Sequence, residues 1–290
     1  MAIYKKYGET FKKLRLQKNL KLSSFSYLGI SPAALCKFEN GKSMLKFDKL
    51  CLALSELSVT LSEYEKCLNQ YDLAHHEQYI QTVGIARMEN NIPTLKSCYK
   101  DAQEIEENMF ALAIKSLYTS LTIEEIDELS SHFEHITLWR YIDLYTLDLT
   151  LDQLRPRQLI YLLEGFFLDS EQSDVLNSLE HRIRFTHVLC HAILILSFHR
   201  HKNVTEHFLK CLHPQKFLHT MFTTNLYNFT KGYWKMIFEN NEQGQQEMER
   251  ALHNFEMLSY PTVANYYKQI YKQIYRQTLK NYSTAQMKIL

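Results

Sequence analysis

Residues that form tight turns are scarce in this sequence. Its 290 residues include only 7 glycines and 5 prolines. A β-sheet protein of this length needs many turns that depend on these two residues, so their scarcity favours long helices with short connections. The sequence therefore predicts an all-α protein.

Long hydrophobic runs are also missing. The amino terminus, MAIYKKYGETFKKLR, has no apolar core like that of a signal peptide. The most apolar stretch, residues 188–198, is too short to cross a bilayer and is bracketed by arginines. The 6 cysteines form no CxxC pair, which in a chain without a secretion signal favours reduced thiols. We therefore expect a cytoplasmic protein that does not enter a membrane.

Motifs for catalysis and for cofactors are absent as well. The sequence contains no GxxxxGK[ST] or GxGxxG phosphate-binding loop and no GxSxG nucleophile turn. His187, Cys190 and His191 lie close together on one predicted helix, but no HExxH arrangement accompanies them and the neighbouring residues are apolar. We expect these three to belong to a buried apolar helix. The sequence predicts neither an enzyme nor a bound metal or cofactor.

Charge is distributed unevenly along the chain. The formal net charge is only +1, yet residues 1–70 hold 12 Lys and Arg against 6 Asp and Glu, whereas residues 71–290 hold 21 against 26. A basic segment joined to an acidic one is typical of a nucleic-acid-binding domain fused to a domain of another kind. The alternative is a chance excess of lysine on a solvated surface.

The basic segment has the pattern of a bundle of short helices. Apolar residues spaced three and four apart predict an amphipathic helix over residues 4–18. A second helix is expected to run from about Ser23, a good N-cap, to Gly29. Two more helices are expected at 46–57 and 60–70.

The segment between Gly29 and Gly41 is the most informative. Ser31 is a good N-cap, Pro32 fits the first position of a helix, and Gly41 is suited to end one. Two short helices separated by a tight turn that contains glycine, the second of them strongly capped, indicate a helix-turn-helix.

The run LGISPAALCKFENGKS resembles the motif of the lambda-repressor-like, or XRE-type, DNA-binding domain, and the five-helix plan over residues 4–70 matches that domain. The resemblance implies an ion pair between Arg15 and Glu39, for which the alternative is two unrelated surface charges. It also implies that the third helix enters the major groove of DNA. The residues that it assigns to DNA contact are Ser23, Ser24, Ser31, Ala33, Ala34, Cys36, Lys37, Lys42 and Lys46.

The base-reading surface departs from the common pattern of that family. Many relatives carry glutamine, serine or arginine where this chain has Ala34, Cys36 and Lys37. Alanine can touch a thymine methyl group but cannot hydrogen-bond to a base. We therefore expect little direct base readout, with the lysines and serines that flank the third helix contacting phosphate. A domain that no longer binds DNA, or that binds protein instead, is the alternative.

Residues 71–290 have the pattern of successive amphipathic helices, with no disordered linker before them. We expect a helix from about Tyr71 to join the two domains directly. Gly232 and Ala251 are nineteen residues apart, like the small residues of a tetratricopeptide repeat, which favours a degenerate TPR-like helical repeat over an ordinary helical hairpin. The expected helices cover residues 71–90, 94–118, 122–136, 138–147, 156–169, 173–200, 203–212, 216–239, 242–258 and 262–281.

An XRE-type domain followed directly by degenerate helical repeats resembles the Rgg/GadR/MutR transcriptional regulators. The segments ETFKKLR and LSSFSYLGISPAALCKFENGKS are similar, without gaps, to the start of those proteins. The resemblance implies a homodimer that binds double-stranded promoter DNA through residues 1–70 and senses a ligand through residues 71–290. In several members of the family that ligand is a short imported peptide, so the resemblance also implies a peptide pheromone and quorum sensing.

A bound peptide needs partners for its backbone and for its carboxylate. Asparagine amides can pair with both backbone N–H and C=O groups, and arginine can hold a carboxylate through two hydrogen bonds. The candidate peptide-binding residues are Arg87, Arg155, Arg157, Arg184, Asn225 and Asn228. For each of them the alternative is a solvated surface residue. A competing function is a protein-interaction module that sequesters a partner protein and uses its N-terminal domain for dimerisation.

Overall fold

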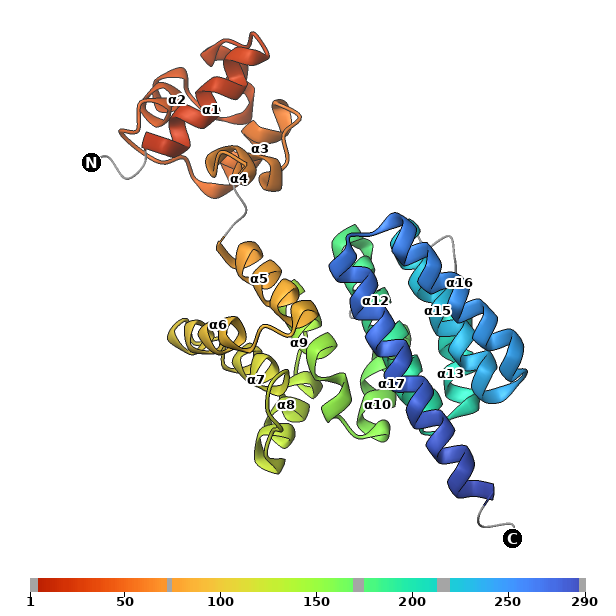
Figure 1. Cartoon of the computed structure of the whole chain (residues 1–290). Helices are drawn as coiled ribbons and strands as arrows, with labels where there is room; N and C mark the ends of the chain where they lie inside the picture. Colours follow the sequence, from red (N-terminus) through yellow and green to blue (C-terminus); the bar gives the residue numbers. More distant parts are fainter. Residues whose placement is uncertain (1–4, 72–74, 169–174, 213–219, 287–290) are drawn as a thin grey trace. The chain divides into compact units, whose positions relative to one another are not determined.

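Every regular element is a helix in the residues that the computed structural model describes, which are 5–71, 75–168, 175–212 and 220–286 (Figure 1). Among these residues, no helix is both long and apolar enough to cross a membrane. The elements are α1 (Lys5–Gln17), η1 (Leu22–Leu28), α2 (Pro32–Glu39), α3 (Phe47–Glu56), α4 (Leu61–Leu68), α5 (His75–Glu89), α6 (Ile92–Glu104), α7 (Asn108–Ser116), α8 (Ile123–Glu134), α9 (Tyr141–Thr150), η2 (Leu151–Gln153), α10 (Pro156–Leu168), η3 (Val175–Asn177), α12 (Leu179–Phe198), α13 (Lys202–Cys211), α15 (Met221–Phe238), α16 (Asn241–Leu258) and α17 (Pro261–Gln286).

The chain folds as two units, Met1–Tyr79 and Ile80–Leu290. Their boundary falls inside α5, so that this helix begins in the first unit and ends in the second. From the sequence, the boundary was expected at residue 70 and the joining helix from about Tyr71, but Tyr71 itself is not helical. Tyr71 has a φ of 63°, in the left-handed region, which a residue inside an α-helix cannot adopt.

The first unit has the five-helix plan expected from its sequence, and its second element is a 3-10 helix, η1. The N-cap of η1 is Lys21, so Ser23 was the wrong choice, whereas Gly29 ends the element in the left-handed conformation, as expected. The core is built on aromatic rings. Phe11 of α1 lies 5.7 Å from both Phe25 of η1 and Phe38 of α2, between ring centres.

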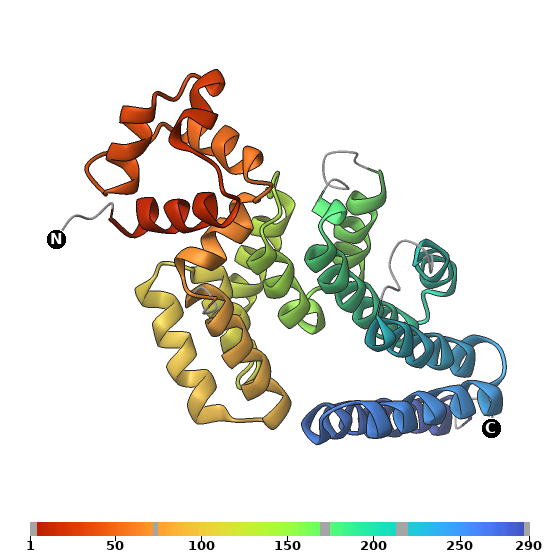
Figure 2. The same cartoon turned by 90° about the horizontal axis from the view of Figure 1, so that it is seen from above.

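The helices of the second unit follow one another in a continuous curve, from the yellow α6 and α7 through green and teal to the blue α17 (Figure 2). One hydrophobic core cluster of buried residues extends from Leu121 to Tyr267. The expected helix over 94–118 is divided into α6 and α7 because Glu106 has a φ of 61°. The expected helix over 173–200 is replaced by η3 and α12, and its first two residues, like residues 216–219 of another expected helix, lie outside the described residues.

Helices α15 and α16 form an antiparallel hairpin with touching backbones. A Cβ atom on Gly244 would lie 2.2 Å from the backbone nitrogen of Met236 and 2.5 Å from the carbonyl oxygen of Gly232. Ala251, which the repeat pattern pairs with Gly232, is buried in the same unit. The hairpin therefore packs through small residues, as the repeat interpretation requires.

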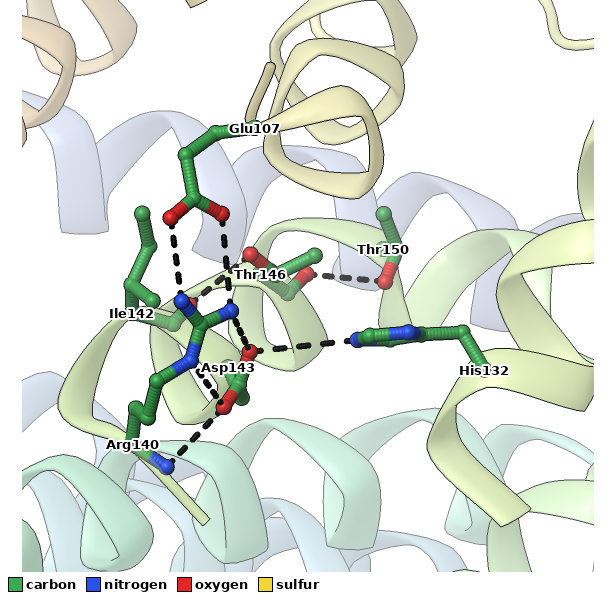
Figure 3. A network of polar contacts seen from close by, with 7 residues as sticks. All are labelled: Glu107, His132, Arg140, Ile142, Asp143, Thr146 and Thr150. Carbon is green, nitrogen blue, oxygen red and sulfur yellow. Dashed lines mark hydrogen bonds and ion pairs between the residues drawn. The ribbon is translucent and has the colours of Figure 1, made fainter. Parts of the chain in front are cut away.

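Helix α9 is buried on every side, although its sequence includes two aspartates and two threonines. The threonines bond within the helix, since Thr146 and Thr150 each donate to a carbonyl oxygen one turn earlier at 2.8 Å. Oδ1 of Asp143 accepts from Nη2 of Arg140 at 2.8 Å and lies 3.8 Å from Nε2 of His132. Figure 3 shows that Arg140 also donates to Glu107. Burial raises the pKa of Asp143, but the His132 and Arg140 contacts outweigh it and lower the pKa to about 2.

Replacing Gly244 by alanine should destabilise the hairpin. The new methyl group cannot fit against the backbone of α15, and overpacking of this kind costs about 1–3 kcal/mol. Thermal unfolding of the full chain, followed by circular dichroism, measures the loss. Gln246→Ala, at an exposed position of α16, is the matched control. Equal melting temperatures for the two variants would contradict the close backbone contact.

Candidate functional site

The amino-terminal end of α2 is fixed as its sequence predicts. The N–H of Ala34 donates to Oγ of Ser31 at 3.2 Å, and Pro32 occupies the first turn. Ile30 before the cap and Leu35 inside the helix are both buried, so that this end of α2 is held by hydrogen bonding and by apolar packing.

The carboxyl-terminal end of α2 closes in a Schellman motif. Gly41 has a φ of 67°, its N–H donates to the carbonyl oxygen of Phe38 at 2.9 Å, and the N–H of Lys42 donates to that of Lys37 at 2.8 Å. Gly8 allows the backbones of α1 and α2 to approach each other closely at this end, because a Cβ on Gly8 would lie 1.9 Å from the Phe38 carbonyl oxygen. The orientation of α2 on the unit is therefore set at both ends.

A buried ion pair joins the last turns of α1 and α2. Arg15 donates from Nε to Oε1 of Glu39 at 2.6 Å and from Nη2 to Oε2 at 2.8 Å, with side chains only 7% and 3% exposed. Its Nη1 donates to the carbonyl oxygen of Leu20 at 2.6 Å. The hydrogen bond to Glu39 raises the pKa of Arg15 against the effect of burial. Both charges are compensated, and α2 is locked to α1.

The residues assigned to DNA contact lie in or beside η1 and α2. Ser23, Ser31, Ala33, Cys36, Lys37, Lys42 and Lys46 are exposed, and Ser24 and Ala34 are half-buried. Ser31 uses its hydroxyl as the cap of α2. Sequence reasoning did not single out Tyr27, which is 69% exposed on η1 and donates its hydroxyl to Glu56 of α3. Nothing in the sequence of η1 indicates this contact with α3.

The second unit contains a cavity of about 700 Å³, within the usual range for ligand pockets. Residues of α5, α9, α12, α15 and α17 line it, together with Asp152 of η2. Much of the wall is apolar or aromatic and includes Phe198, Phe222, Val263 and Ile270. A cavity of this size and composition suits a short, largely apolar ligand.

One part of the cavity wall is strongly charged. Asp148 of α9, with a side chain only 7% exposed, accepts from Nη1 of Arg184 at 2.9 Å through Oδ2. Nη1 of Arg87 lies 3.7 Å from the same oxygen, and Nδ1 of His191 lies 3.7 Å from Oδ1. His191 also faces Asp152, with 3.4 Å between Nε2 and Oδ2. Three elements, α5, α9 and α12, thus meet at one carboxylate.

The cluster keeps its charges at neutral pH. Burial raises the pKa of Asp148, but the contacts with His191, Arg87 and Arg184 outweigh it and hold that pKa well below its usual range. Burial lowers the pKa of His191, but Asp152 and Asp148 together raise it to about 9. Three cations therefore face two carboxylates. The neighbouring His187 differs, because burial lowers its pKa to about 4 and leaves it neutral.

Two of the six candidate peptide-binding residues, Arg87 and Arg184, line the cavity, and the other four do not. Arg155 and Arg157 are exposed around the start of α10, and Asn228 is exposed on α15. Asn225 is buried between α15 and α16, where its amide donates to the Ala251 carbonyl oxygen at 2.8 Å. Spacing along α15 could not reveal that the close hairpin encloses one asparagine and leaves the other outside.

Three residues of the charged wall were not predicted from the sequence: Asp148, Asp152 and His191. The expectation that His187, Cys190 and His191 belong to a buried apolar helix holds for Cys190, whereas both histidines face the cavity. The available signal was an aspartate inside the otherwise uncharged run LYTLDLT, since a buried charge requires a partner.

A model of the family described as "HTH-type transcriptional regulator Rgg, C-terminal domain" matches residues 89–269. This chain belongs to the Rgg family. The match covers most of the second unit and includes the charged wall except Arg87 of α5. The helical repeat domain that holds the cavity is therefore the characteristic domain of the Rgg family.

Solved structures have the same fold along nearly the whole chain. The SHP pheromone receptor Rgg2 of Streptococcus dysgalactiae is 18% identical, with a TM-score of 0.72, and the match covers 92% of this chain and 99% of that one. A putative transcriptional regulator of Listeria monocytogenes is 15% identical, with a TM-score of 0.77, and the match covers 95% of this chain and 99% of that one. ComR of S. thermophilus was solved with DNA and its signalling peptide ComS. It is 16% identical, with a TM-score of 0.53, and the match covers 92% of this chain and 99% of that one.

Glu39→Gln should destabilise the first unit by about 3 kcal/mol or more, because it leaves the Arg15 guanidinium buried without a counter-charge. Hydrogen exchange of the α1 and α2 amides in the full chain measures the loss. Glu9→Gln removes the exposed pair with Lys5 and should cost less than about 1 kcal/mol. Equal loss of protection in both variants would show that the buried pair has no special weight.

The stability that His191 contributes should depend on pH. Its pKa is raised from 6.5 to about 9 in the folded chain, so this stability is fully present below pH 6.5 and is lost as the pH rises through about 9. The difference in unfolding free energy between the natural chain and His191→Gln should therefore shrink from pH 6 to pH 10, as measured by urea unfolding. A difference that stays constant over this range would refute a charged His191.

Proposed function

We propose that this chain is a sequence-specific DNA-binding transcriptional regulator controlled by a short signalling peptide that binds in the cavity of the second unit. The observation that carries the proposal is that cavity, with its apolar and charged walls, in the domain that defines the Rgg family. Relatives of the same fold support it, because Rgg2 is described as a pheromone receptor and ComR was solved with DNA and a signalling peptide.

The DNA-binding part of the proposal rests on α2. Its two ends are fixed, so that Ala33, Cys36 and Lys37 are held on one exposed surface that can enter a major groove. Lys42 and Lys46 follow on the exposed segment before α3, where they can neutralise phosphates. Lys37 is the only charged side chain on the exposed surface of α2, and we assign it a base or phosphate contact.

The peptide-binding part rests on unsatisfied polar atoms in the cavity wall. Among the described residues, Nε of Arg184 and Nε2 of His187 are buried without a hydrogen-bond partner. Such atoms are costly unless a ligand or water completes them. Gln269 and Gln273 lie one turn apart on α17 and line the cavity, unlike Asn225 and Asn228, so we assign to them the role of pairing with peptide backbone.

The partners and the location follow from the same proposal. Homodimer formation on double-stranded promoter DNA and action in the cytoplasm are both implied by the resemblance to the family. A module that only sequesters a partner protein is not favoured, because the relatives are regulators and a cavity of about 700 Å³ suits a short ligand.

Lys37→Ala should weaken DNA binding about tenfold, because it removes a charged contact in the groove. Fluorescence anisotropy with the DNA upstream of the chain's own gene, across a salt series, measures the change. Lys100→Ala removes an exposed lysine of α6 in the second unit and should leave DNA affinity within about twofold.

Two results would count against the regulator. Binding that random DNA competes away equally well would exclude sequence-specific recognition by this chain. An unchanged affinity for Lys37→Ala in the presence of specific binding would show that α2 is not the recognition helix.

A further inference from the structure

The carboxyl end of η1 is held by α3. Nζ of Lys49 donates to the carbonyl oxygen of Leu28, the last residue of η1, at 2.7 Å, and the hydroxyl of Tyr27 donates to Glu56. Helix α2 is instead joined to α1 by the buried ion pair described above. The two helical elements of the helix-turn-helix thus have different polar supports, and their relative placement depends on the short turn between them.

The ammonium group of Lys49 lies directly against that turn. Gly29, which follows η1, has a φ of 71°, and its N–H donates to the Ser26 carbonyl oxygen at 3.0 Å. A Cβ atom on Gly29 would lie only 2.9 Å from Nζ of Lys49. Glycine is therefore needed here for two reasons: its backbone adopts the left-handed conformation without strain, and it leaves space for the ammonium group.

The position of Lys49 within α3 indicates that its contact serves η1. Lys49 lies in the first turn of α3, where the helix dipole favours an acidic side chain such as the neighbouring Asp48. The carboxyl end of η1 has the opposite preference, because the last carbonyl groups of a helix lack partners within it and attract a cation. Lys49 is half-buried, whereas Lys42 and Lys46, which are assigned to phosphate contact, are exposed. Lys49 therefore acts within the fold.

Recognition by a helix-turn-helix needs two sets of contacts at once. Ser23 and Ser24 of η1 are assigned to phosphate, which fixes the register of the protein on DNA, and Lys37 of α2 is assigned to a contact in the groove. A functional site tolerates displacements of only about 0.5 Å in its contacting groups. A displacement of η1 relative to α2 therefore weakens one set of contacts when the other forms.

We propose that Lys49 is a positioning residue for DNA recognition: its ammonium group fixes the turn between η1 and α2, so that both elements contact DNA together. The inference rests on the DNA-binding function proposed above and deepens it, because it assigns part of the sequence specificity to a side chain that does not touch DNA. Loss of the ammonium group should lower the affinity for the target sequence and spare the affinity for unrelated DNA, which depends on adaptable phosphate contacts.

Lys49→Met removes the ammonium group and keeps an unbranched side chain. The full chain is tested by fluorescence anisotropy with DNA from upstream of its own gene and with random DNA of the same length, across a salt series. We expect about tenfold weaker binding to the upstream DNA, comparable to the loss of one specific contact, and a change within about twofold on random DNA. Lys49→Arg retains a cationic donor for the Leu28 carbonyl oxygen and should stay within about threefold of the natural chain.

The salt series separates positioning from a direct contact with phosphate. The logarithm of the affinity falls with the logarithm of the salt concentration, with a slope of about 0.9 for each phosphate contact. A positioning role predicts the same slope for Lys49→Met and for the natural chain. A slope lower by about 0.9 would instead place Lys49 on a phosphate and overturn the positioning role.

Two matched variants check that the effect is specific to the turn. Lys18→Met removes the same charge from the same unit, together with a hydrogen bond to Oγ of Ser58 at 2.8 Å. Tyr27→Phe removes the contact of η1 with Glu56 of α3. Neither change touches Gly29, so both variants should bind the upstream DNA within about twofold of the natural chain. An equal loss in these two variants and in Lys49→Met would overturn a special role for the turn.

Gly29→Ala tests the contact from the other side. The new methyl group would displace the ammonium group of Lys49, and alanine also strains the left-handed backbone. The backbone strain is the same with either residue at position 49, whereas displacement of the ammonium group matters only in the natural chain. Gly29→Ala should therefore weaken specific binding at least about threefold more in the natural chain than in Lys49→Met. Equal effects in the two backgrounds would refute the coupling between Lys49 and the turn.

The possible failures are distinguishable. Melting temperatures, followed by circular dichroism, establish that each variant is folded at the temperature of the binding measurements. A Lys49→Met variant that melts earlier yet keeps the natural ratio of specific to random affinity would reveal a purely structural role and overturn positioning. Failure of the natural chain to distinguish upstream from random DNA would instead count against the proposed DNA-binding function itself.

Discussion

The second unit depends on the burial of two carboxylates in one helix. Asp143 and Asp148 both belong to α9, which is buried on every side, and an uncompensated buried carboxylate costs several kcal/mol. Basic side chains from α5, α8 and α12 and from the segment before α9 surround these two groups. Because each buried carboxylate needs basic partners, residues from distant parts of the chain come together around α9. The candidate ligand site is one of the places where they meet.

The site at Asp148 differs from the network at Asp143 in what surrounds it. Arg140 satisfies Asp143 and Glu107 together, so that network is closed (Figure 3). At Asp148 the cations exceed the carboxylates and the cluster opens onto a cavity with apolar walls. A hydrogen-bonded network outside the cavity supports packing, whereas an excess of cations beside a cavity can provide charge for a ligand. The two halves of one helix thus have different roles.

Local features of the fold could be predicted from the sequence, whereas the site could not. The caps of α2 depend on residues only a few positions apart, so Ser31, Pro32 and Gly41 were sufficient to predict them. The all-α class followed from composition in the same way. The cavity is assembled by five helices, and no spacing along one helix reveals which neighbours it meets. Asn225 and Asn228 illustrate this, because they share a helix face in sequence but not an environment in the structure.

The residues that hold α2 in place are separate from those that it exposes, and this affects how the sequence of this protein can change during evolution. The helix is held in place by its two caps, by the buried residues Leu35 and Phe38 and by the ion pair of Glu39. None of these features involves the exposed side chains at positions 33, 36 and 37. Substitutions at the exposed positions leave the folding free energy nearly unchanged. With α2 as the proposed recognition helix, descendants of this chain can therefore acquire new target sites on DNA one residue at a time, without first acquiring extra stability.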